Sequence, residues 1–441
     1  MKFGGTSVQD ADAIRQVAEL VRTAAPKKVL VVVSAAGKTT SALFNSAGDA
    51  ERGDLAGALE RLHAVQNHHA AIISDLFDDV PKDLQDFCKI CFDEVSLLLQ
   101  GVSITHELTP RTLDAIASTG ELLSSKILAH FLNAKWVNAR QLMTTDKRFG
   151  AAQPMVLEVE KNCRHEVEPH LSPDQAVVTQ GYIGSTEDGV PTTLGREGSD
   201  YSAALFGAGL NACEIQIWTD VEGILTCDPR LLEEAIPIPE MSFDEASALA
   251  TAGAKVLHPS TIKPAQQAGI PVTVRCTKKP SGRFTRISHS TESTRPVTGI
   301  AIQSPVGLLS VHSSSDRDSS RFLFSCFDAL RSNGIEPLIA SFSHSSLTVV
   351  MSGEPATGLL DQLTELGKTT FVGARAVVNA VGARLGQTPG SVRQLLNSLG
   401  DLPIDLVYMG ANDTTLSICI PEVLSQEALV RLHRVLEGMR V

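Results

Sequence analysis

Along the first 280 residues, the pattern of hydrophobic and polar positions predicts a series of strands, each followed by one or more helices. Residues 27–33 (KKVLVVV) are almost continuously apolar, which predicts a buried strand of a parallel sheet. Ile14, Val17, Ala18 and Val21 recur at helical spacing and predict an amphipathic helix. Further strand-like runs occur at 135–138, 176–183, 214–218 and 271–275, and helical patterns cover most of 42–100, 115–132 and 241–253. This alternation predicts an α/β fold in which helices cover both faces of a mainly parallel sheet.

The pattern changes after a stretch rich in Lys, Ser, Thr, Gly and Pro at 277–296, which we expect to be a domain boundary. Two similar passes follow, each with β-α-β-β-α content and a period of roughly 65–70 residues, which predicts two ferredoxin-like α+β modules. The expected domains are a catalytic domain at 1–280, a linker at 281–297, and modules at 298–373 and 374–441. The modules hold few candidate catalytic residues, so we expect them to bind ligands or pair.

The stretch 195–203 (GREGSDYSA) combines glycines, an arginine, a serine and an aspartate between a predicted strand and a predicted helix. A helix N-terminus offers unpaired N–H groups and partial positive charge, which suit phosphate. Arg196 can bind a carboxylate or phosphate as a fork, and Asp200 can orient a metal or a reacting group. An ordinary strand–turn–helix with Ser199 as the N-cap explains the same residues equally well.

Two more loops have the composition of a phosphate site. Lys2 precedes Gly4 and Gly5, which lead into the first predicted helix. The run 34–40 (SAAGKTT) follows a predicted strand, and open α/β sheets bind ligands at this end of their strands. Its GKT is not a Walker A loop, because position 32 holds valine where that motif requires glycine.

Composition excludes several classes of protein. The formal charge is −12 without a long basic run, so nucleic acid or an anionic membrane is not an expected partner. Neither a membrane-spanning apolar run nor a hydrophobic signal segment is evident, and eight scattered cysteines do not form a disulfide framework. We therefore expect a cytoplasmic protein. Cys88 and Cys91 form a CxxC, but they lie in a helical pattern without a second pair, which favours core packing over a metal site.

Seven separated stretches resemble one family, the aspartate kinases of the amino acid kinase fold with C-terminal tandem ACT modules. They are KFGGTS (2–7), SAAGKTT (34–40), STGELLSSKIL (118–128), TQGYIG (179–184), LGREGSDYSAA (194–204), WTDVEGILTCDPR (218–230) and GAKVLHP (253–259). The resemblance covers nearly the whole chain and implies a three-layer αβα kinase domain. It also implies phosphoryl transfer from ATP, with Mg²⁺, to the side-chain carboxylate of L-aspartate. The product would be 4-phospho-L-aspartate, the first step toward lysine, threonine and methionine.

The resemblance also assigns roles to residues. The catalytic pair would be Lys2 and Asp200. Substrate would be bound by Ser34, Thr40, Glu121, Arg196 and Ser199, with Arg196 on the α-carboxylate and Glu121 on the α-ammonium. Nucleotide would be bound by Lys2, Gly4, Gly5, Thr219, Asp220, Arg230 and Lys255. From the residues alone, a charge on a helix surface is the better explanation of Glu121 than a ligand-binding acid. No dedicated protein metal site is expected, because Mg²⁺ accompanies ATP.

The resemblance further implies a homodimer or larger assembly paired through the modules and inhibited by an end-product amino acid. Lysine is the first expectation, with threonine or insensitivity as open alternatives. The expected pocket includes Ser320, Glu336 and Phe342, where Glu336 matches an acid of lysine-inhibited relatives and Phe342 replaces a usual glutamate. Other readings are a different amino acid kinase, such as glutamate 5-kinase or acetylglutamate kinase, and a non-catalytic amino-acid sensor.

Overall fold

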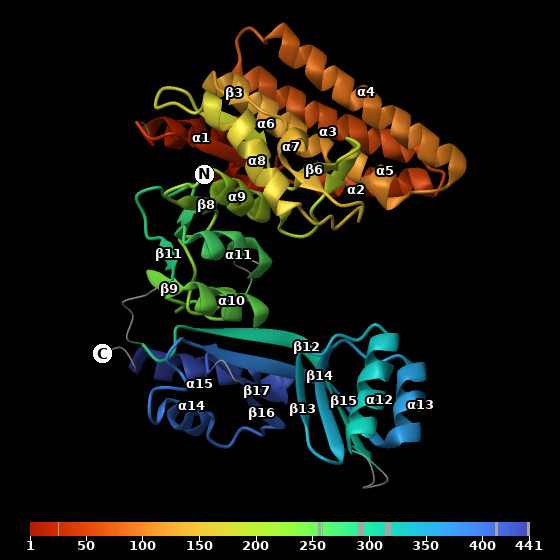
Figure 1. Ribbon diagram of the computed structural model, residues 1–441, viewed down its shortest axis with the longest axis vertical. Helices are drawn as coiled ribbons and strands as arrows, with labels where there is room; N and C mark the ends of the chain where they lie inside the picture. Colours follow the sequence, from red (N-terminus) through yellow and green to blue (C-terminus); the bar gives the residue numbers. More distant parts are fainter. Residues whose placement is uncertain are drawn as a thin grey trace. The chain divides into compact units, whose positions relative to one another are not determined.

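The computed structural model describes residues 1–24, 26–254, 257, 259–289, 295–313, 319–410 and 413–438, and these form two compact units (Figure 1). The first unit comprises Met1–Ile224, Pro239–Phe243 and Leu257–Thr291. The second comprises Leu225–Ile238, Asp244–Val256 and Glu292–Val441. Within the described part of the chain, no helix is both long enough and apolar enough to cross a membrane.

An eight-stranded sheet in the order β3-β5-β2-β1-β8-β10-β11-β9 forms the centre of the first unit. Its strands are β1 (Lys2–Phe3), β2 (Leu30–Val33), β3 (Lys135–Trp136), β5 (Val177–Gln180), β8 (Ile215–Thr219), β9 (Glu240–Ser242), β10 (Val272–Cys276) and β11 (Thr285–Ser288). The neighbours from β3 to β10 pair in parallel, and β11 pairs antiparallel with β10 and parallel with β9. The predicted mainly parallel sheet is confirmed.

Helices cover both faces of this sheet. On one face, α1 (Ala11–Thr23) and α6 (Thr119–Leu132) share a buried core with Phe3 and Trp218. On the other face, α9 (Gly198–Gly209) and α11 (Pro259–Ala268) lie against β8 and β10, where Ala204 and Ile262 lie beside Ile215 and Ile217. Because side chains of a strand alternate between faces, Phe3 enters the first core and Lys2 faces the α9 side.

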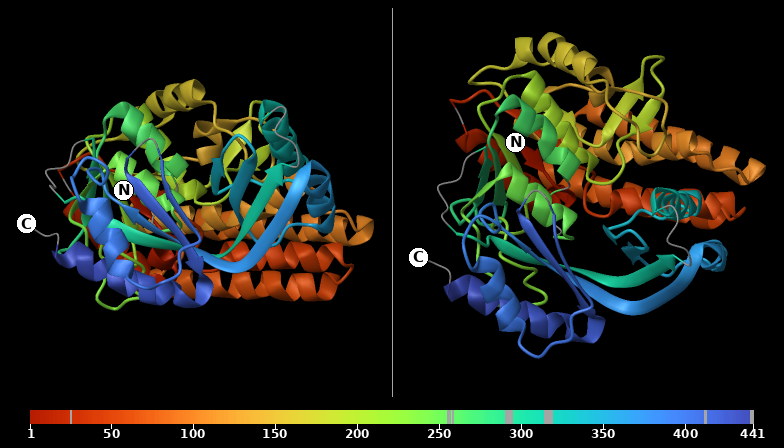
Figure 2. Two further views of the ribbon diagram at one scale, coloured as in Figure 1. Left: turned by 90° about the horizontal axis from the view of Figure 1, so that it is seen from below. Right: turned by 60° about the horizontal axis from the view of Figure 1, so that its bottom comes forward.

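The remaining elements of the first unit flank this sheet. Three helices, α2 (Thr39–Glu51), α3 (Leu55–Leu76) and α4 (Lys82–Thr105), form a separate apolar core with α5 (Pro110–Ala117). Figures 1 and 2 show α3 and α4 as long neighbouring helices. A small sheet of β4 (Thr144–Thr145), β6 (Ile183–Thr186) and β7 (Pro191–Thr193) stands beside α7 (Ala139–Leu142) and α8 (Val156–Glu166). Two short 3₁₀ helices, Gly5–Val8 and Glu168–His170, complete the unit.

The second unit contains one six-stranded antiparallel sheet in the order β13-β14-β12-β15-β17-β16. The strands are β12 (Gly299–Ser313), β13 (Ile339–Phe342), β14 (Ser346–Ser352), β15 (Gly367–Val381), β16 (Leu406–Met409) and β17 (Thr415–Pro421). The helices are α12 (Ser319–Ser332) and α13 (Thr357–Leu366) in one half, and α14 (Ser391–Leu399) and α15 (Ser425–Gly438) in the other, with a 3₁₀ turn at Glu422–Leu424. Each half has its own apolar core.

Two long strands join the halves of the second unit. β12 and β15 each contain 15 residues and pair along their length, as Figure 2 shows. Among the described strands, the first part of β12 pairs with the end of β15 alone, and the end of β15 pairs with β17 on its other side. The first half of β15 and the second part of β12 pair with each other, and β14 lies beside β12 there. The predicted β-α-β-β-α order is confirmed, but the halves share one continuous sheet.

Two pieces of the region expected to be catalytic belong to the second unit. These are Leu225–Ile238 and nearly all of α10 (Phe243–Thr251). The carboxylate of Glu245 in α10 accepts hydrogen bonds from the Thr298 hydroxyl and, at 3.1 Å, from the Ala383 N–H. The Asn379 amide donates to the Ala252 carbonyl at 3.3 Å. Side-chain hydrogen bonds therefore attach the first turn of this helix to residues next to β12 and β15, and the residue after its end to β15 itself.

Several local predictions need correction. The helix expected at 115–132 is divided at Ser118 into α5 and α6. The expected linker at 281–297 contains strand β11, which pairs with β10 of the large sheet. The interpretation of Ser199 as an N-cap is wrong, because Glu197 holds that position and Ser199 is already in α9.

Candidate active site

The predicted phosphate loops meet at the carboxyl ends of adjacent central strands. β1 lies between β2 and β8, and the Gly4 N–H donates a hydrogen bond to the Trp218 carbonyl at 3.3 Å. After β1 the chain enters a 3₁₀ helix at Gly5, and after β2 it enters α2 at Thr39. The N-termini of several helices, with their unpaired backbone N–H groups, therefore lie at this edge of the sheet. Open α/β sheets bind their ligands at this edge.

An ion pair between Lys2 and Asp200 lies at the middle of this edge. The Lys2 Nζ is 2.6 Å from the Asp200 Oδ1, and both side chains are nearly buried. Asp200 stands in the first turn of α9, whose N-terminus carries partial positive charge. A strand of two residues thus brings the lysine amine to the helix that carries the aspartate, although 198 positions (200 − 2) separate them in the sequence.

Glycines allow the loops of the site to pack tightly. A Cβ atom on Gly5 would lie 2.8 Å from the Ala35 carbonyl oxygen, and the Gly5 carbonyl accepts a hydrogen bond from the Gly37 N–H at 2.9 Å. A Cβ atom on Gly181 would lie 2.6 Å from the Ser199 Cβ. Any side chain at either glycine would separate these loops, so the glycines bring the predicted motifs into one site.

Glu121 presents an unpaired carboxylate oxygen at this site. Its side chain is 3% exposed, and its Oε1 accepts a hydrogen bond from the Ala35 N–H at 3.1 Å. Its Oε2 has no hydrogen-bond partner among the described residues. Burial raises the pKa of this carboxyl group to about 8, because an ion loses its hydration there. A buried acid with a free oxygen can bind a cationic group of a ligand, which argues against a simple surface charge.

The other predicted substrate residues surround this region in different states of exposure. The Ser34 carbonyl accepts a hydrogen bond from the Ser124 hydroxyl at 2.8 Å, next to the Ala35 that Glu121 contacts. Thr40 is half-buried in the first turn of α2. Ser199 is buried beside Asp200. Arg196 is exposed at the turn before α9, and none of the described ion pairs includes it.

The structure describes part of the predicted nucleotide set. Thr219 and Asp220 lie at the end of β8, where the Thr219 hydroxyl donates to the Asp220 carboxylate at 3.1 Å. Arg230 belongs to the second unit and binds the Asp228 carboxylate through two guanidinium nitrogens. Lys255 lies outside the described residues. The backbone of Gly4 and Gly5 stands directly beside β8 and the loop after β2.

Sequence reasoning missed Asp114, which supports the loop before α9. Its Oδ1 accepts a hydrogen bond from the Thr193 hydroxyl at 2.6 Å. Its Oδ2 accepts from the N–H groups of Gly150 and Thr193 at 2.9 and 3.0 Å. The carboxylate therefore fixes the end of β7, two residues before the turn that carries Arg196. The sequence contained only a weak signal for it, a single acid at the start of a predicted helix, seven residues before Glu121.

The possible metal ligands of this site suit a metal ion that binds together with a nucleotide. Among the described residues, no group of three or more His, Cys, Asp or Glu side chains could hold an ion by itself. Asp200 and Asp220 offer hard carboxylate oxygens at the ligand edge of the sheet. Mg²⁺ typically uses one or two such carboxylates together with substrate phosphates.

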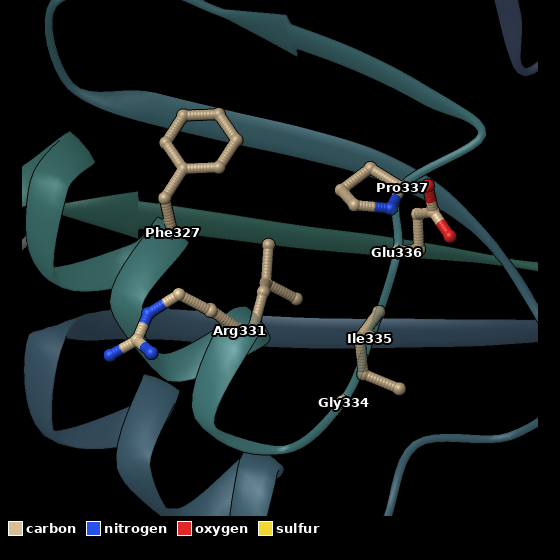
Figure 3. Close-up of a pocket in the computed structure, with 7 residues that line it drawn as sticks. Phe327, Arg331, Gly334, Ile335, Glu336 and Pro337 are labelled. Carbon is tan, nitrogen blue, oxygen red and sulfur yellow. The ribbon is translucent and has the colours of Figure 1, made fainter. Parts of the chain in front are cut away.

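The second unit has a pocket of about 320 Å³ at Glu336, one of the three residues expected to bind an effector (Figure 3). Glu336 lines this pocket, and Arg331 of α12 lines its opposite side. Its remaining lining residues are Phe327, Leu330, Gly334, Ile335 and Pro337. Ser320 and Phe342 are exposed and are not among the described lining residues. The pocket thus offers one acid and one base, and Arg331 also contacts the Asp328 carboxylate at 2.7 Å.

Comparison with known proteins gives one family for the chain. The model of the amino acid kinase family matches residues 1–276. The lysine-sensitive aspartokinase 3 of Escherichia coli is 33% identical, over 98% of this chain and 97% of the relative. The chloroplastic aspartokinase 1 of Arabidopsis thaliana is 29% identical, over 98% of this chain and 79% of the relative.

Solved structures agree with the sequence comparison. E. coli aspartokinase III in complex with aspartate and ADP, described as the R-state, has a TM-score of 0.84 and 31% identity over 98% of both chains. The same enzyme with lysine and aspartate, described as the T-state, has a TM-score of 0.80 and 32% identity. That match covers 99% of this chain and 98% of the other.

Proposed function

The chain belongs to the amino acid kinase family, and we propose that it transfers the γ-phosphoryl group of ATP to the side-chain carboxylate of L-aspartate. The product is 4-phospho-L-aspartate, from which lysine, threonine and methionine are made. Similarity to E. coli aspartokinase 3 over nearly the whole chain supports this activity. The observation that carries the proposal is the Lys2–Asp200 ion pair at the start of α9, in the same site as the unpaired oxygen of Glu121.

Glu121 and Arg196 fit the two charged ends of an amino acid. The Glu121 carboxylate binds the α-ammonium group, which supplies a partner for its Oε2, an oxygen without one among the described residues. Arg196 is exposed and binds the α-carboxylate through its planar fork. With both ends held, the side-chain carboxylate of aspartate is directed toward Lys2 and Asp200. Ser34, Thr40 and Ser199 add hydroxyl and backbone contacts around the substrate.

Lys2 stabilises the charge of the phosphoryl group during transfer. Phosphoryl transfer depends on positioning and charge stabilisation more than on covalent chemistry. In the free protein the Lys2 amine is neutralised by Asp200, and a bound phosphate competes for it. Asp200 is then available to orient the reacting groups, with the N–H groups of Gly5 and of the start of α9 on the phosphate oxygens. Asp200 and Asp220 are the side chains that would hold Mg²⁺, which would neutralise charge on the phosphates of ATP.

A hydroxamate assay with three amino acids tests the activity. Purified protein is incubated with Mg·ATP and hydroxylamine together with aspartate, glutamate or N-acetylglutamate. An acyl phosphate formed from any of them gives a coloured hydroxamate. We expect product with aspartate and little with the two longer acids. Preference for glutamate or N-acetylglutamate would identify another amino acid kinase, and no product from any acid would favour a sensor.

We further propose that lysine inhibits the enzyme by binding at the Glu336–Arg331 pocket of the second unit. The E. coli relative is lysine-sensitive, and its structure has been solved with lysine and aspartate. A free amino acid carries both charges, and this pocket offers an acid and a base on opposite sides. An inhibitor must bind the inactive arrangement better than the active one, typically by 1–3 kcal/mol, or roughly 5–150-fold.

The matched variants Glu336→Ala and Glu354→Ala test this pocket. Glu354 is an exposed acid of the same unit outside the pocket, so it controls for loss of charge. We expect Glu336→Ala to raise the lysine concentration for half-inhibition about tenfold or more, with Glu354→Ala like wild type. Threonine is measured in parallel. Unchanged lysine inhibition in Glu336→Ala would refute the pocket assignment.

We propose a homodimer or larger assembly paired through the first half of the second unit. Large apolar side chains are exposed there, including Phe324 at 74% and Phe342 at 64%. Exposed apolar residues in one small module are typical of an interaction surface. Light scattering after size exclusion measures the mass directly. We expect a multiple of 47.0 kDa, and a monomer at micromolar concentration would refute the proposal.

A further inference from the structure

Tyr182 has a strained backbone that the reaction proposed above does not explain. Its φ angle is +68°, in the left-handed region that favours glycine and is uncommon for a side chain as large as tyrosine. The residue follows Gly181 in the turn between β5 and β6, within the stretch 179–184 (TQGYIG). A conformation of this kind costs free energy and persists only where surrounding contacts fix it, and such residues cluster at ligand sites. The contacts of Tyr182 therefore show what holds the strain and which site it serves.

Both backbone polar groups of Tyr182 have partners on other elements. Its N–H group donates a hydrogen bond to the Ser202 hydroxyl of α9 at 3.0 Å. Its carbonyl oxygen accepts a hydrogen bond at 2.9 Å from the N–H group of Leu194, the residue after β7. The strained conformation is therefore fixed from two sides, by a helix and by the segment that leads to Arg196.

Ser202 links this turn to the first turn of α9. Its hydroxyl accepts from the Tyr182 N–H and donates to the Gly198 carbonyl at 2.8 Å, so one hydroxyl makes both bonds of the bridge. Because Ser202 is fully buried, solvent does not compete for either bond. A Cβ atom on Gly198 would lie 3.0 Å from the Tyr182 Cδ2, so the turn and the helix are also in close contact.

The same turn adjoins residues of the proposed aspartate site. A Cβ atom on Gly181 would lie 2.6 Å from the Ser199 Cβ, so the turn packs directly on that substrate residue. The Gly181 N–H also donates to the carbonyl of Val33, the last residue of β2, at 2.9 Å. Burial raises the pKa of the Tyr182 phenol to about 12, and the charge of the Glu121 carboxylate contributes to this rise. The phenol therefore lies in the same buried region as Glu121.

We propose that Ser202 is a positioning residue of the aspartate site, an inference that rests on the function proposed above. Its hydroxyl holds Tyr182 in the left-handed conformation and thereby keeps the turn packed on Ser199. Without the hydroxyl, the N–H group of Tyr182 loses its acceptor, and the backbone can relax toward negative φ. That relaxation moves Gly181 away from Ser199 and loosens the site around the amino acid.

The variant Ser202→Ala separates this role from a purely structural one. We expect the KM for aspartate to rise about tenfold and the KM for ATP to change little. Ser202→Cys, with a weaker hydrogen-bonding group of similar size, should give an intermediate rise and extends the test if Ser202→Ala does not fold. Ser391→Ala is the matched control, because the buried Ser391 hydroxyl donates to the Leu385 carbonyl at 2.6 Å in the second unit. It should leave both KM values unchanged even where it lowers the Tm.

An unchanged KM for aspartate in both Ser202 variants, or an equal rise in both KM values, would overturn the inference. A wild-type chain that does not phosphorylate aspartate would instead refute the proposed function, and this inference with it.

A double-mutant cycle tests whether Ser202 acts through the conformation of Tyr182. Glycine adopts a positive φ without cost, so the turn of Tyr182→Gly no longer needs to be held. In that background, Ser202→Ala should raise the KM for aspartate by less than about threefold. Tyr182→Asn is the second background, since asparagine adopts the left-handed conformation more readily than tyrosine. A full tenfold rise in either background would show that Ser202 acts by another route and would overturn the inference.

Discussion

Glu121→Gln gives the sharpest test of the site, because the buried acid must ionise before it can bind an ammonium group. Its pKa of about 8 leaves a small ionised fraction near neutral pH. By the titration equation, the fraction is about 0.03 at pH 6.5 and about 0.8 at pH 8.5. If only the carboxylate form binds aspartate, kcat/KM for aspartate rises about 25-fold across this range, since affinity scales with the competent fraction.

Glutamine keeps the shape of the side chain and removes this titration. We expect Glu121→Gln to lose about 10-fold to 100-fold in kcat/KM for aspartate at pH 8.5, where a charge-assisted hydrogen bond is lost. Its profile between pH 6.5 and 8.5 should also lack the rise of about 25-fold expected for the wild type. The KM for ATP should change little, because Glu121 contacts the loop at Ala35 and not the residues predicted for the nucleotide.

Stability gives an independent measurement of the same group. The pKa of Glu121 is raised from 4.5 in the unfolded chain to about 8 in the fold, so the folded state binds the additional proton between these values. The contribution of this group to stability is therefore complete below about pH 4.5 and is lost as the pH rises to about 8. Relative to wild type, the Tm of Glu121→Gln should rise across this window.

Glu107→Gln is the control for these measurements, since Glu107 is an exposed acid before α5 and should leave both profiles unchanged. A wild-type kcat/KM for aspartate that is flat from pH 6.5 to 8.5 would refute the reasoning. So would a Glu121→Gln enzyme with the wild-type rise, because the titrating group would then be elsewhere.

Three further predictions concern neighbouring residues. Lys2→Ala and Asp200→Ala should each lower kcat by roughly 10²–10³ or more, because charge stabilisation of the transition state is lost while little packing is removed. Steady-state kinetics measures the loss, and circular dichroism checks that each variant is folded. Near-native turnover of either variant would contradict the assignment of this catalytic pair. Arg196→Lys should raise the KM for aspartate more than that for ATP, since lysine lacks the planar fork; equal weakening of both would place Arg196 over the phosphates. Asp114→Asn should destabilise the fold by about 2–4 kcal/mol in chemical denaturation, because a carboxylate oxygen that accepts buried hydrogen bonds is replaced by a donor. The control Asp12→Asn, at an exposed acid, should stay within about 0.5 kcal/mol of wild type. Similar losses in both variants would show that Asp114 does not support the loop before α9.

The sequence predicted the large sheet well because its signals are local. The apolar run that becomes β2 and the helical spacing of α1 depend only on neighbouring residues. The grouping of the candidate residues was also predictable where glycines and charged residues follow strands, since parallel strands bring their carboxyl ends to one edge. Lys2, Glu121 and Asp200 lie in that region as expected.

Other features depend on distant pairings that no local pattern encodes. The apolar pattern of residues 299–303 does not determine whether they pair with the first or the second half of the C-terminal unit. In the structure they pair with the end of β15. Likewise, the amphipathic pattern of α10 does not say which sheet will cover it. Asp114 was missed because a single acid in a helix is usually a surface charge, and its three hydrogen-bond donors come from residues 36 and 79 positions away.

The shared strands β12 and β15 limit how this C-terminal unit can change during evolution. Each half contains a portion of both strands, so a gene break between residues 373 and 374 would divide β15 and leave the first part of β12 without its neighbour. Recombination can therefore add or remove the pair of modules as a whole, but it cannot exchange one half for that of another protein without also restoring a strand. Because each of these strands belongs to both halves, a substitution in β12 or β15 can affect both halves. The two modules therefore cannot evolve independently, although their order of elements looks like that of a simple duplication.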